Sequence, residues 1–483
     1  YEISACLVGS EMCIRDSYRS KERHSSGRYS TPARRAVMRV LSQARPQGNA
    51  MNIKIDALNY YGATKKYHLH FPALREDIEA DVVIIGGGFS GINTALELAE
   101  QGITNVVVLE ARHLGYGGTG RNGGQVMAGI GHDIEAVKKH VGKEGLETLF
   151  KIANLGAGII RERIRKYNID ADFVPGYGYL AYNQRQLKTL RQWEKEFKAA
   201  TPDEEIELYT GKEVQQVVGS EVYCGALKHM GGGQIHSLNM LLGSAQAAHS
   251  LGVKIFESSP VVEVNYGKQV RVRTAMGSVK AAKLLWACDS FLNNMEPEIY
   301  NKTLVTYSYQ VSTEPLSDEL IERISPLRGA FSDIRPVINY YRVTRENRLL
   351  FGSATRFVEY TPNDFAAWNR TLLAEVFPYL RDVKIDFAWG GPMACSANLF
   401  PQIGTLRDHN NVFYVQGYSG FGVTPSHIVC KILAEGINGG SDRYRLLSSI
   451  PHATIHGRDS LRLLLVTAGK LMHQTAGFWK GRS

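Results

Sequence analysis

Three glycines at a fixed spacing are the first residues in this chain whose arrangement could do chemistry. Gly86, Gly88 and Gly91 form a GxGxxG pattern within VVIIGGGFSGI, residues 82–92. The first glycine lets the chain turn sharply out of a strand, the second lets backbone approach a pyrophosphate, and the third lets the following helix pack closely on the sheet. The spacing predicts a site where helix N–H groups hold the phosphates of a dinucleotide.

The elements around these glycines are those that a dinucleotide site requires. DVVIIGGG indicates a buried parallel strand, SGINTALELAEQG an amphipathic helix that ends at Gly102, and NVVVLE a second buried strand. Glu110 closes that strand nineteen positions after Gly91, where its carboxylate can accept hydrogen bonds from the ribose of the AMP half. A glycine turn used only for packing is the alternative, and the complete βαβ setting favours the dinucleotide.

A second glycine-rich stretch follows this acid directly and bears on which dinucleotide is bound. ARHLGYGGTGRNGGQ, residues 111–125, contains six glycines and the polar residues Thr119, Arg121, Asn122 and Gln125. A simple nicotinamide fold does not require such a loop, whereas a longer cofactor such as FAD would be wrapped by it. A flexible surface loop is the other interpretation that its composition allows.

A late segment repeats the order of strand, glycine turn and helix. NVFYVQ leads into GYSGFG, residues 417–422, and then into the helix TPSHIVCKILAEGI. A helix start of this kind directs N–H groups and a positive dipole end at whatever lies there. Beside a flavin it would stabilise the negative charge that arrives on reduction. A packing turn is equally consistent with the segment alone, and the first motif favours the cofactor.

The joint set of motifs resembles one flavoprotein family. DVVIIGGGFSG and GRNGGQ are similar to the FAD-binding start of D-amino-acid-oxidase-like oxidoreductases, and most similar to their gamma-glutamylputrescine oxidase and glycine/sarcosine-oxidase-like branch. NYYGAT, GGGQIHSLNMLLGSAQAAHSLGV, RLLFGSAT, FPQIGTL and IPHATIHG extend the similarity over residues 57–460. The resemblance implies an α/β fold in which a Rossmann-like FAD-binding domain is interleaved with an antiparallel-sheet substrate domain.

The resemblance also implies a role for each cofactor-binding position. The pyrophosphate would lie at Gly86, Gly88, Ser90 and Gly91, and the adenosine end at Glu110, Arg112 and the backbone of Val262. The rest of FAD would be held by Thr119, Arg121, Asn122, Gly123, Gly124 and Gln125, and by Gly417, Ser419, Gly420, Phe421, Gly422 and Thr424. This chain departs from the family at Cys288 and Asp289, where a small–Asn–Ala sequence is usual.

The reaction implied by the resemblance is oxidation of an amine C–N bond. The substrate would be a secondary amine, an amino acid or a gamma-glutamyl polyamine, and the imine left after hydride transfer to flavin N5 would hydrolyse. No second GxGxxG follows a strand, so we expect O2 or another electron acceptor rather than NAD(P)H. The alternatives are a flavin dehydrogenase of the same fold that acts on a hydroxy acid or reduces a quinone, and a non-catalytic flavin-binding subunit.

Catalysis of this kind needs few acid–base groups, so the candidates are pocket residues. VINYYRVT, in a predicted antiparallel sheet, supplies Tyr341 and Arg342 as the catalytic candidates, with Tyr340 beside them. Because side chains alternate along a strand, Tyr340 and Tyr341 cannot both face the flavin. We expect structural roles for His236 and His427.

Composition narrows the partners and the compartment. The six cysteines form no CxxC pair, so we expect no metal site and a reducing compartment, the cytoplasm. Cys395 lies where some relatives tether FAD covalently, and we expect a free buried thiol there. No apolar run is long enough to span a bilayer, since LRLLLVTAGKLM is interrupted by Lys470.

The N-terminal fifty residues are unlike the rest of the chain. They carry five of the nine net positive charges, so the remainder gives no reason to expect a nucleic-acid partner. An Arg- and Ser-rich transit segment is one interpretation. We favour another: CLVGSEMCIRDS resembles a translated cloning adapter, so that Met51 or Met38 is the start and residues 1–50 are a disordered, non-native tail.

The domains are expected to interleave along the chain. The FAD-binding domain is predicted to comprise residues 51–130, 231–300 and 391–483, the last part with C-terminal helices. Residues 131–230 are predicted to be a mixed helical segment of the substrate domain, and residues 301–390 its antiparallel sheet.

Overall fold

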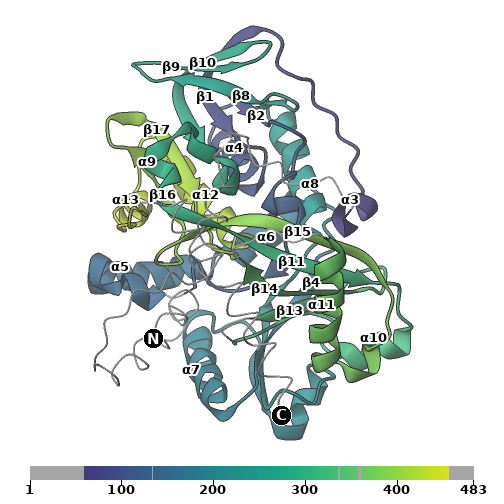
Figure 1. The fold of residues 1–483 in the computed structure, drawn as a ribbon. Coiled ribbons are helices and arrows are strands. Elements are labelled where there is room, and N and C mark those ends of the chain that lie inside the picture. The colour runs from purple at the N-terminus through teal and green to yellow at the C-terminus, as the bar shows by residue number, and fades with distance from the viewer. Residues whose placement is uncertain (1–58, 133, 336–337, 357–361, 456–483) are drawn as a thin grey trace, which may run out of the picture. The chain divides into compact units, whose positions relative to one another are not determined.

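The computed structural model describes residues 59–132, 134–335, 338–356 and 362–455, whose helices and strands group around two β-sheets (Figure 1). The expectations about the N-terminal tail and about the apolar segment near Lys470 fall outside the described residues. Within the described ranges, no helix combines the length and the apolar character needed to cross a bilayer.

The first sheet is built around parallel strands from three separate parts of the chain. β1 (Asp77–Ile85) lies between β10 (Ser278–Trp286) and β2 (Val106–Leu109), and both pairings are parallel. Residues 82–85 of β1 are buried, as expected for a parallel strand covered on both faces. The strand order is β16-β17-β10-β1-β2-β7, and β8 and β9 extend it antiparallel from β10. The other bounds are β7 (Lys254–Phe256), β8 (Val261–Asn265), β9 (Val270–Thr274), β16 (Gln402–Leu406) and β17 (His409–Gln416).

The carboxyl ends of β17, β10, β1 and β2 meet at one edge of this sheet because the four strands run parallel. The chain leaves them at Gly417, Ala287, Gly86 and Glu110. Two of these exits touch, since a Cβ built on Gly86 would lie 2.4 Å from the Ala287 carbonyl oxygen. The crevice outside the carboxyl ends is where open parallel sheets bind ligands. The sheet order thus brings both predicted glycine turns to one edge.

A layer of helices packs beside this sheet. α4 (Phe89–Glu100) contacts both α8 (Ser237–Ser250) and α12 (Pro425–Ile437), as Figure 1 shows, and residues 91–99 are all buried. α12 also contacts α6 (Gly156–Lys166) and α13 (Asp442–Ser448), and α13 contacts α5 (Lys138–Ala153). Arg163 of α6 donates to Glu97 at 2.5 Å and to Asn93 at 2.9 Å, both on α4. This buried ion pair joins α6 to α4.

The second sheet has the order β15-β11-β14-β13-β12-β4-β6-β3, with β5 paired to β6. Its pairings are antiparallel, as predicted, except that β4 and β12 run parallel. α11 (Pro362–Val376) packs on β11, β14 and β15, and α7 (Gln184–Ala200) packs on β4, β5 and β6. The bounds are β3 (Gln125–Val126), β4 (Val174–Ala181), β5 (Ile206–Thr210), β6 (Gly225–Gln234), β11 (Thr303–Thr313), β12 (Ala330–Asp333), β13 (Asn339–Val343), β14 (Leu349–Arg356) and β15 (Ile385–Ser396).

Several helices begin at a side-chain cap or a 3₁₀ turn. The charged stretch 184–200 is one helix, α7, capped by the Asn183 side chain. The mixed helical segment predicted over residues 131–230 begins with a 3₁₀ turn, which is followed by α5 and α6. Helix α8 is capped by His236, whose Nδ1 accepts the hydrogen bond from Asn239 N at 3.1 Å. The shorter helices are α3 (Tyr60–Thr64), α9 (Pro297–Tyr300) and α10 (Asp318–Ile324).

Candidate cofactor and active site

The first glycine turn has the close packing that its spacing predicts. Gly86 has a φ of +119°, which residues with side chains rarely adopt. A Cβ on Gly91 would lie 1.9 Å from the Gly86 carbonyl oxygen, so only glycine lets α4 approach β1 this closely. The first helical hydrogen bond runs from Ile92 N to Gly88 O at 3.0 Å. The N–H groups of Ser90 and Gly91 come before this bond, at the N-terminal end of α4. Helix N-termini favour anions because their first N–H groups have no partner within the helix.

Two side chains from other segments reach this helix start. Thr119 Oγ1 accepts a hydrogen bond from Phe89 N at 2.9 Å, and Ser90 Oγ lies 3.0 Å from the Tyr418 hydroxyl oxygen. Thr119 belongs to the loop 115–125 and Tyr418 to the late turn. The structure therefore brings the three glycine motifs together at the N-terminus of α4.

Glu110 lies at the exit of β2 with both carboxylate oxygens bonded to backbone. Oε2 accepts from Gly87 N at 2.7 Å, and Oε1 accepts from Arg112 N at 2.8 Å. Burial raises the pKa of the Glu110 carboxyl, while these two N–H groups oppose that shift. The Arg112 side chain is exposed, with its guanidinium 5.8 Å from the centre of the Tyr116 ring. Val262 is the extra residue at a register shift between β8 and β9, and its side chain is exposed.

Asn122 fixes the shape of the loop 115–125 from within. Its Nδ2 donates to two carbonyls of the loop, and its Oδ1 accepts from Gly124 N at 2.8 Å. Ser237 Oγ donates to the same oxygen at 2.6 Å, which ties the loop to the start of α8. Gly124 has a φ of +69°, and a Cβ there would lie 2.2 Å from Ile235 O. These contacts rule out the flexible surface loop that composition alone allowed.

The same loop carries polar groups that the protein leaves unsatisfied. Arg121 is used internally, since its Nε donates to Tyr116 O at 3.0 Å and its side chain is buried. Gln125 Oε1 is buried and has no hydrogen-bond partner among the described residues. Within the same ranges, the N–H groups of Asn122 and Gly123 donate to no protein acceptor. Unpaired buried polar groups are those that a bound ligand would satisfy.

The turn between β17 and α12 is bent by three residues in the left-handed region. Their φ values are +76° at Gly417, +54° at Ser419 and +89° at Gly420. α12 begins at Pro425, so the N–H groups of Gly422 and Thr424 precede its first turn. These groups and the helix dipole make this end of α12 electropositive.

Met127 and His132, which follow the loop 115–125 in the chain, hold the late turn at residues 417–424. Thr424 Oγ1 accepts from Met127 N at 3.0 Å. His132 Nε2 lies 2.7 Å from Ser419 O, and its ring lies 4.0 Å from the Phe421 ring. Burial lowers the pKa of His132, so a neutral ring donates to this carbonyl. Sequence reasoning missed His132, because no local pattern marks it.

Asp289 is a second site residue that sequence reasoning did not assign. Its Oδ1 accepts from Gly417 N at 2.9 Å, and its Oδ2 accepts from Ala394 N at 3.1 Å. Burial raises the pKa of the Asp289 carboxyl, and the same backbone N–H groups oppose the shift. The carboxylate joins the late turn to β15. The departure from the family pattern at this position was the only signal in the sequence.

The predicted catalytic pair is split between the two faces of β13. Tyr341 is fully buried, with its ring 5.3 Å from that of Phe331 and 5.9 Å from that of Phe351. Since adjacent residues in a strand face opposite sides, Tyr341 points away from Arg342. The Tyr341 ring belongs to the core of the second sheet, and the catalytic role expected for Tyr341 stays a prediction.

Tyr340 and Arg342 lie on the other face of β13, against the loop 115–125. The Tyr340 hydroxyl lies 2.9 Å from Ser308 Oγ, and a Cβ on Gly123 would lie 2.8 Å from the Tyr340 ring. Arg342 is buried, and its Nε donates to Gly123 O at 2.8 Å. Tyr340 and Arg342 therefore both contact the loop 115–125.

The remaining candidates have structural roles or reduced reactivity. Burial lowers the pKa of His236, the α8 cap, to about 4, and the pKa of His427 to about 3. His427 Nδ1 lies 2.8 Å from Val423 O in the first turn of α12. Cys395 is a free buried thiol beside Thr306, and burial raises its pKa to about 11.

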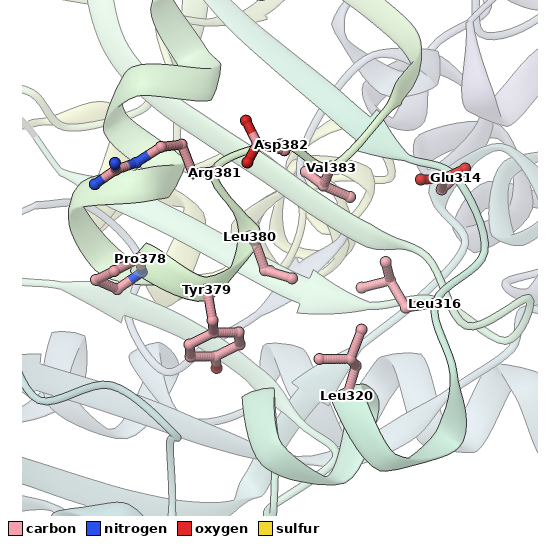
Figure 2. Close-up of a pocket in the computed structure, with 9 residues that line it drawn as sticks. All are labelled: Glu314, Leu316, Leu320, Pro378, Tyr379, Leu380, Arg381, Asp382 and Val383. Atoms are coloured by element: carbon pink, nitrogen blue, oxygen red, sulfur yellow. The ribbon is translucent and has the colours of Figure 1, made fainter.

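An open cleft lies at the other end of the second sheet and shares none of these residues. It has a volume of about 590 Å³, and Figure 2 shows the side chains that line it. They come from the link between β11 and α10, from α10 itself and from residues 378–383 after α11. They include Leu316, Leu320 and Tyr379. Its lining mixes apolar residues with the charged Glu314, Arg381 and Asp382.

Comparison with known proteins agrees with this geometry. Residues 81–436 match the family model described as FAD dependent oxidoreductase, DAO. The chain is 35% identical to the gamma-glutamylputrescine oxidoreductase of Escherichia coli strain K12 over 85% of this chain and 96% of the relative. It is 34% identical to the probable oxidoreductase OrdL of Haemophilus influenzae over 85% of this chain and 95% of that relative.

Solved structures show the same fold at lower identity. Glycine oxidase from Geobacillus kaustophilus superposes with a TM-score of 0.62 at 17% identity, covering 75% of this chain and 95% of that one. L-proline dehydrogenase from P. horikoshii superposes with a TM-score of 0.63 at 22% identity, covering 76% of this chain and 96% of that one. The matched family model and the two relatives each span most of the chain. The protein therefore belongs to the DAO family of FAD-dependent oxidoreductases, and its cofactor is FAD.

Proposed function

We propose that this protein oxidises the C–N bond of a small amine: a secondary amine, an amino acid or a gamma-glutamyl polyamine. The observation that carries the proposal is the similarity to gamma-glutamylputrescine oxidoreductase along 96% of that relative. FAD, when bound, supplies the hydride acceptor, N5, and an electron acceptor such as O2 then restores it. The imine product hydrolyses in water.

The residues proposed to hold FAD fall into three groups. The N-terminus of α4 would bind the pyrophosphate through Gly86, Gly88, Ser90 and Gly91. Glu110, Arg112 and the backbone of Val262 would bind the adenosine end. Two loops would hold the flavin end, through Thr119, Arg121, Asn122, Gly123, Gly124 and Gln125 and through Gly417, Ser419, Gly420, Phe421, Gly422 and Thr424. The unsatisfied Gln125 Oε1 and Gly123 N–H support this assignment.

Helix α12 has an electrostatic part in the proposal. Its N-terminal N–H groups and dipole favour negative charge at the late turn. Two-electron reduction brings negative charge to the flavin, so α12 would stabilise the reduced state without moving. Asp289 holds this turn through Gly417 N, which keeps the donors in place before the charge arrives.

The chain's part in the chemistry is to orient the substrate and exclude water. We propose that the substrate lies against the face of the second sheet that carries Tyr340, whose hydroxyl lies 2.9 Å from Ser308 Oγ. Arg342 is not proposed as a substrate ligand, although it was a catalytic candidate. All three of its nitrogens already donate to the protein, to Gly123, Gln234 and Tyr61. A neutral amine near Tyr340 would avoid the cost of burying a second cation.

The domain division proposed from the sequence is compatible with the two sheets. Every strand of the first sheet falls in residues 51–130, 231–300 or 391–483, which we propose form the FAD-binding domain. The second sheet falls mainly in residues 131–230 and 301–390, the proposed substrate domain. β3 belongs to the second sheet but lies within residues 51–130, and β6 and β15 extend across the boundaries at 230 and 390.

A single panel tests the function. The FAD-loaded protein is mixed without oxygen with secondary amines, amino acids, gamma-glutamyl polyamines and hydroxy acids, and flavin bleaching is followed at each addition. Bleaching by an amine is the expected result. Bleaching by hydroxy acids alone selects the dehydrogenase alternative, and no bleaching by any donor selects a non-catalytic subunit. Acid precipitation reports in the same experiment whether the flavin is covalent, and we expect it to be released.

A further inference from the structure

Five consecutive carbonyls in the glycine-rich loop each accept a hydrogen bond from outside the loop. The acceptors are the backbone oxygens of residues 120–124. Asn59 Nδ2 donates to Gly120 O at 3.3 Å, and both Gln310 Nε2 and Trp389 Nε1 donate to Arg121 O, at 2.6 and 3.1 Å. The Tyr61 hydroxyl donates to Asn122 O at 2.8 Å. Arg342 Nε donates to Gly123 O at 2.8 Å, and Ile235 N donates to Gly124 O at 2.9 Å. The donors come from α3 and its cap, β11, β15, β13 and the link between β6 and α8.

These hydrogen bonds fix where the opposite side of the loop backbone points. In a trans peptide the C=O of one residue and the N–H of the next point in opposite directions, and the described chain has no cis peptide. Gln310 and Trp389 hold the carbonyl of Arg121, which turns the N–H of Asn122 the other way. Tyr61 holds the carbonyl of Asn122, which does the same for the N–H of Gly123.

Those are the two N–H groups that lack a protein acceptor in the described chain. The neighbouring peptides differ: Arg121 N donates to Gly118 O at 3.2 Å, and Gly124 N donates to Asn122 Oδ1 at 2.8 Å. The loop therefore keeps two adjacent donors unpaired, and these belong to the two central peptides whose carbonyls are held by side chains. Gly123 is buried and Asn122 is half-buried, and buried donors are seldom left unpaired without a ligand to receive them.

A buried cation stands behind one of these donors. Arg342 NH2 donates to the Tyr61 hydroxyl at 3.1 Å, and that hydroxyl donates to Asn122 O at 2.8 Å. The Arg342 side chain is buried, and it forms no ion pair with a carboxylate among the described residues. A hydroxyl that accepts from a cation becomes a stronger donor, and the chain of hydrogen bonds polarises the peptide that ends in Gly123 N–H.

We propose that Tyr61, supported by Arg342, and Gln310 with Trp389 are positioning residues that direct the N–H groups of Asn122 and Gly123 at FAD. The inference rests on the proposed function, in which the loop 115–125 holds the flavin end. It gives a role to the NYYGAT segment, which lies before the first strand and supplies Tyr61. None of the four residues needs to touch the cofactor, since each acts through a peptide of the loop.

Two neighbouring tyrosines allow a matched test. Tyr60 and Tyr61 are both buried in α3, but the Tyr60 hydroxyl donates to Glu346 Oε2 at 2.8 Å instead of to the loop. In Tyr61→Phe we expect the dissociation constant for FAD to rise about tenfold or more, because a donor backed by a cation is lost. In Tyr60→Phe we expect a change within about twofold. The visible circular dichroism of bound flavin should change in Tyr61→Phe only.

Gln310→Met is the second variant, because it removes a donor to Arg121 O and keeps a side chain of similar size. We expect it to weaken FAD binding and to alter the flavin spectrum as Tyr61→Phe does. Thermal melting of each FAD-free variant separates positioning from folding. A purely structural role would lower the melting temperature and leave the affinity and spectrum of the folded protein unchanged.

The outcomes distinguish this inference from the function beneath it. Wild-type protein that refuses FAD refutes the proposed site and the inference with it. Wild-type protein that binds FAD, with Tyr61→Phe and Gln310→Met binding it as tightly and with the same spectrum as Tyr60→Phe, overturns the inference alone. If Tyr61→Phe does not fold, Gln310→Met decides by the same two measurements.

Discussion

Ser90 Oγ and the Tyr418 hydroxyl oxygen lie 3.0 Å apart although 328 positions separate them in the chain. Ser90 is in the first turn of α4, and Tyr418 is in the turn that leads to α12. The contact places the electropositive ends of two helices next to each other, where both dipoles would favour a negatively charged ligand. FAD carries negative charge on its pyrophosphate and gains more on reduction, so one cofactor can use both ends.

Gly91 supplies the most direct test of the first turn. In Gly91→Ala the new Cβ would lie 1.9 Å from the Gly86 carbonyl oxygen, so α4 must move away from β1. We expect a loss of stability of about 2–3 kcal/mol and a protein that purifies without flavin. Urea unfolding and the ratio of flavin to protein absorbance measure the two effects.

Gly158→Ala is the control for that variant. Gly158 lies in α6, and a Cβ there meets nothing within 4 Å. Alanine should stabilise the helix by roughly 0.5–1 kcal/mol and leave the flavin content unchanged. Equal flavin content in both variants would contradict the role given to Gly91.

Asp289 should control how firmly the late turn is held. Asp289→Ala leaves Gly417 N and Ala394 N without their acceptor, and we expect about 1–3 kcal/mol less stability together with faster loss of FAD on dilution. Asp289→Asn keeps one acceptor oxygen and tolerates the φ of +45°, so it should lie between wild type and alanine. Flavin fluorescence during dilution gives the order, and an alanine variant that holds FAD like wild type would refute this role.

The two tyrosines of β13 should respond differently to loss of a hydroxyl. Tyr340→Phe removes a group on the face against the glycine-rich loop, and we expect kcat/KM for the amine found by bleaching to fall roughly threefold to tenfold. Tyr341→Phe alters a ring packed among Phe331 and Phe351, so it should shift the melting temperature without changing turnover. Steady-state kinetics that show the reverse pattern would restore Tyr341 as the pocket residue.

The buried ion pair between α6 and α4 should stabilise the helix layer only while both partners are present. Arg163→Met removes the hydrogen-bonded partner of the buried Glu97 carboxylate and leaves it only the more distant Lys431 Nζ, at 3.9 Å, so the expected cost is up to about 3–5 kcal/mol. The double variant Arg163→Met/Glu97→Leu removes both charges and should lose less than the sum of the single changes. Denaturant unfolding of the full cycle measures the coupling, and additive losses would show that the pair is not coupled.

His236 predicts a loss of stability in weak acid. Burial, and then the charge of Arg342, lower its pKa from 6.5 to about 4, so the unfolded chain binds a proton that the folded chain refuses. Its stability contribution is complete above pH 6.5 and falls by up to about 1.4 kcal/mol per pH unit as the pH drops toward 4. His236→Asn, which can still cap α8, should flatten this slope. Urea unfolding at each pH measures the slope for wild type and for the variant.

The local geometry of the site was predictable from sequence because neighbouring residues decide it. The turn at Gly86, the close approach at Gly91 and the acid at Glu110 depend on spacings that one βαβ unit repeats wherever it forms. The resemblance to the family depended on these same short motifs.

Only the tertiary structure decided which distant groups complete the site. Strand alternation predicts that Tyr340 and Tyr341 face opposite ways. The pairing of β13 with β12 and β14 decides which of the two side chains enters the core, and that side chain is Tyr341. Asp289, His132 and Tyr61 act through partners at least 61 positions away, and no local period encodes such a distance. Their roles follow from the order in which strands join each sheet, which burial of the whole core selects.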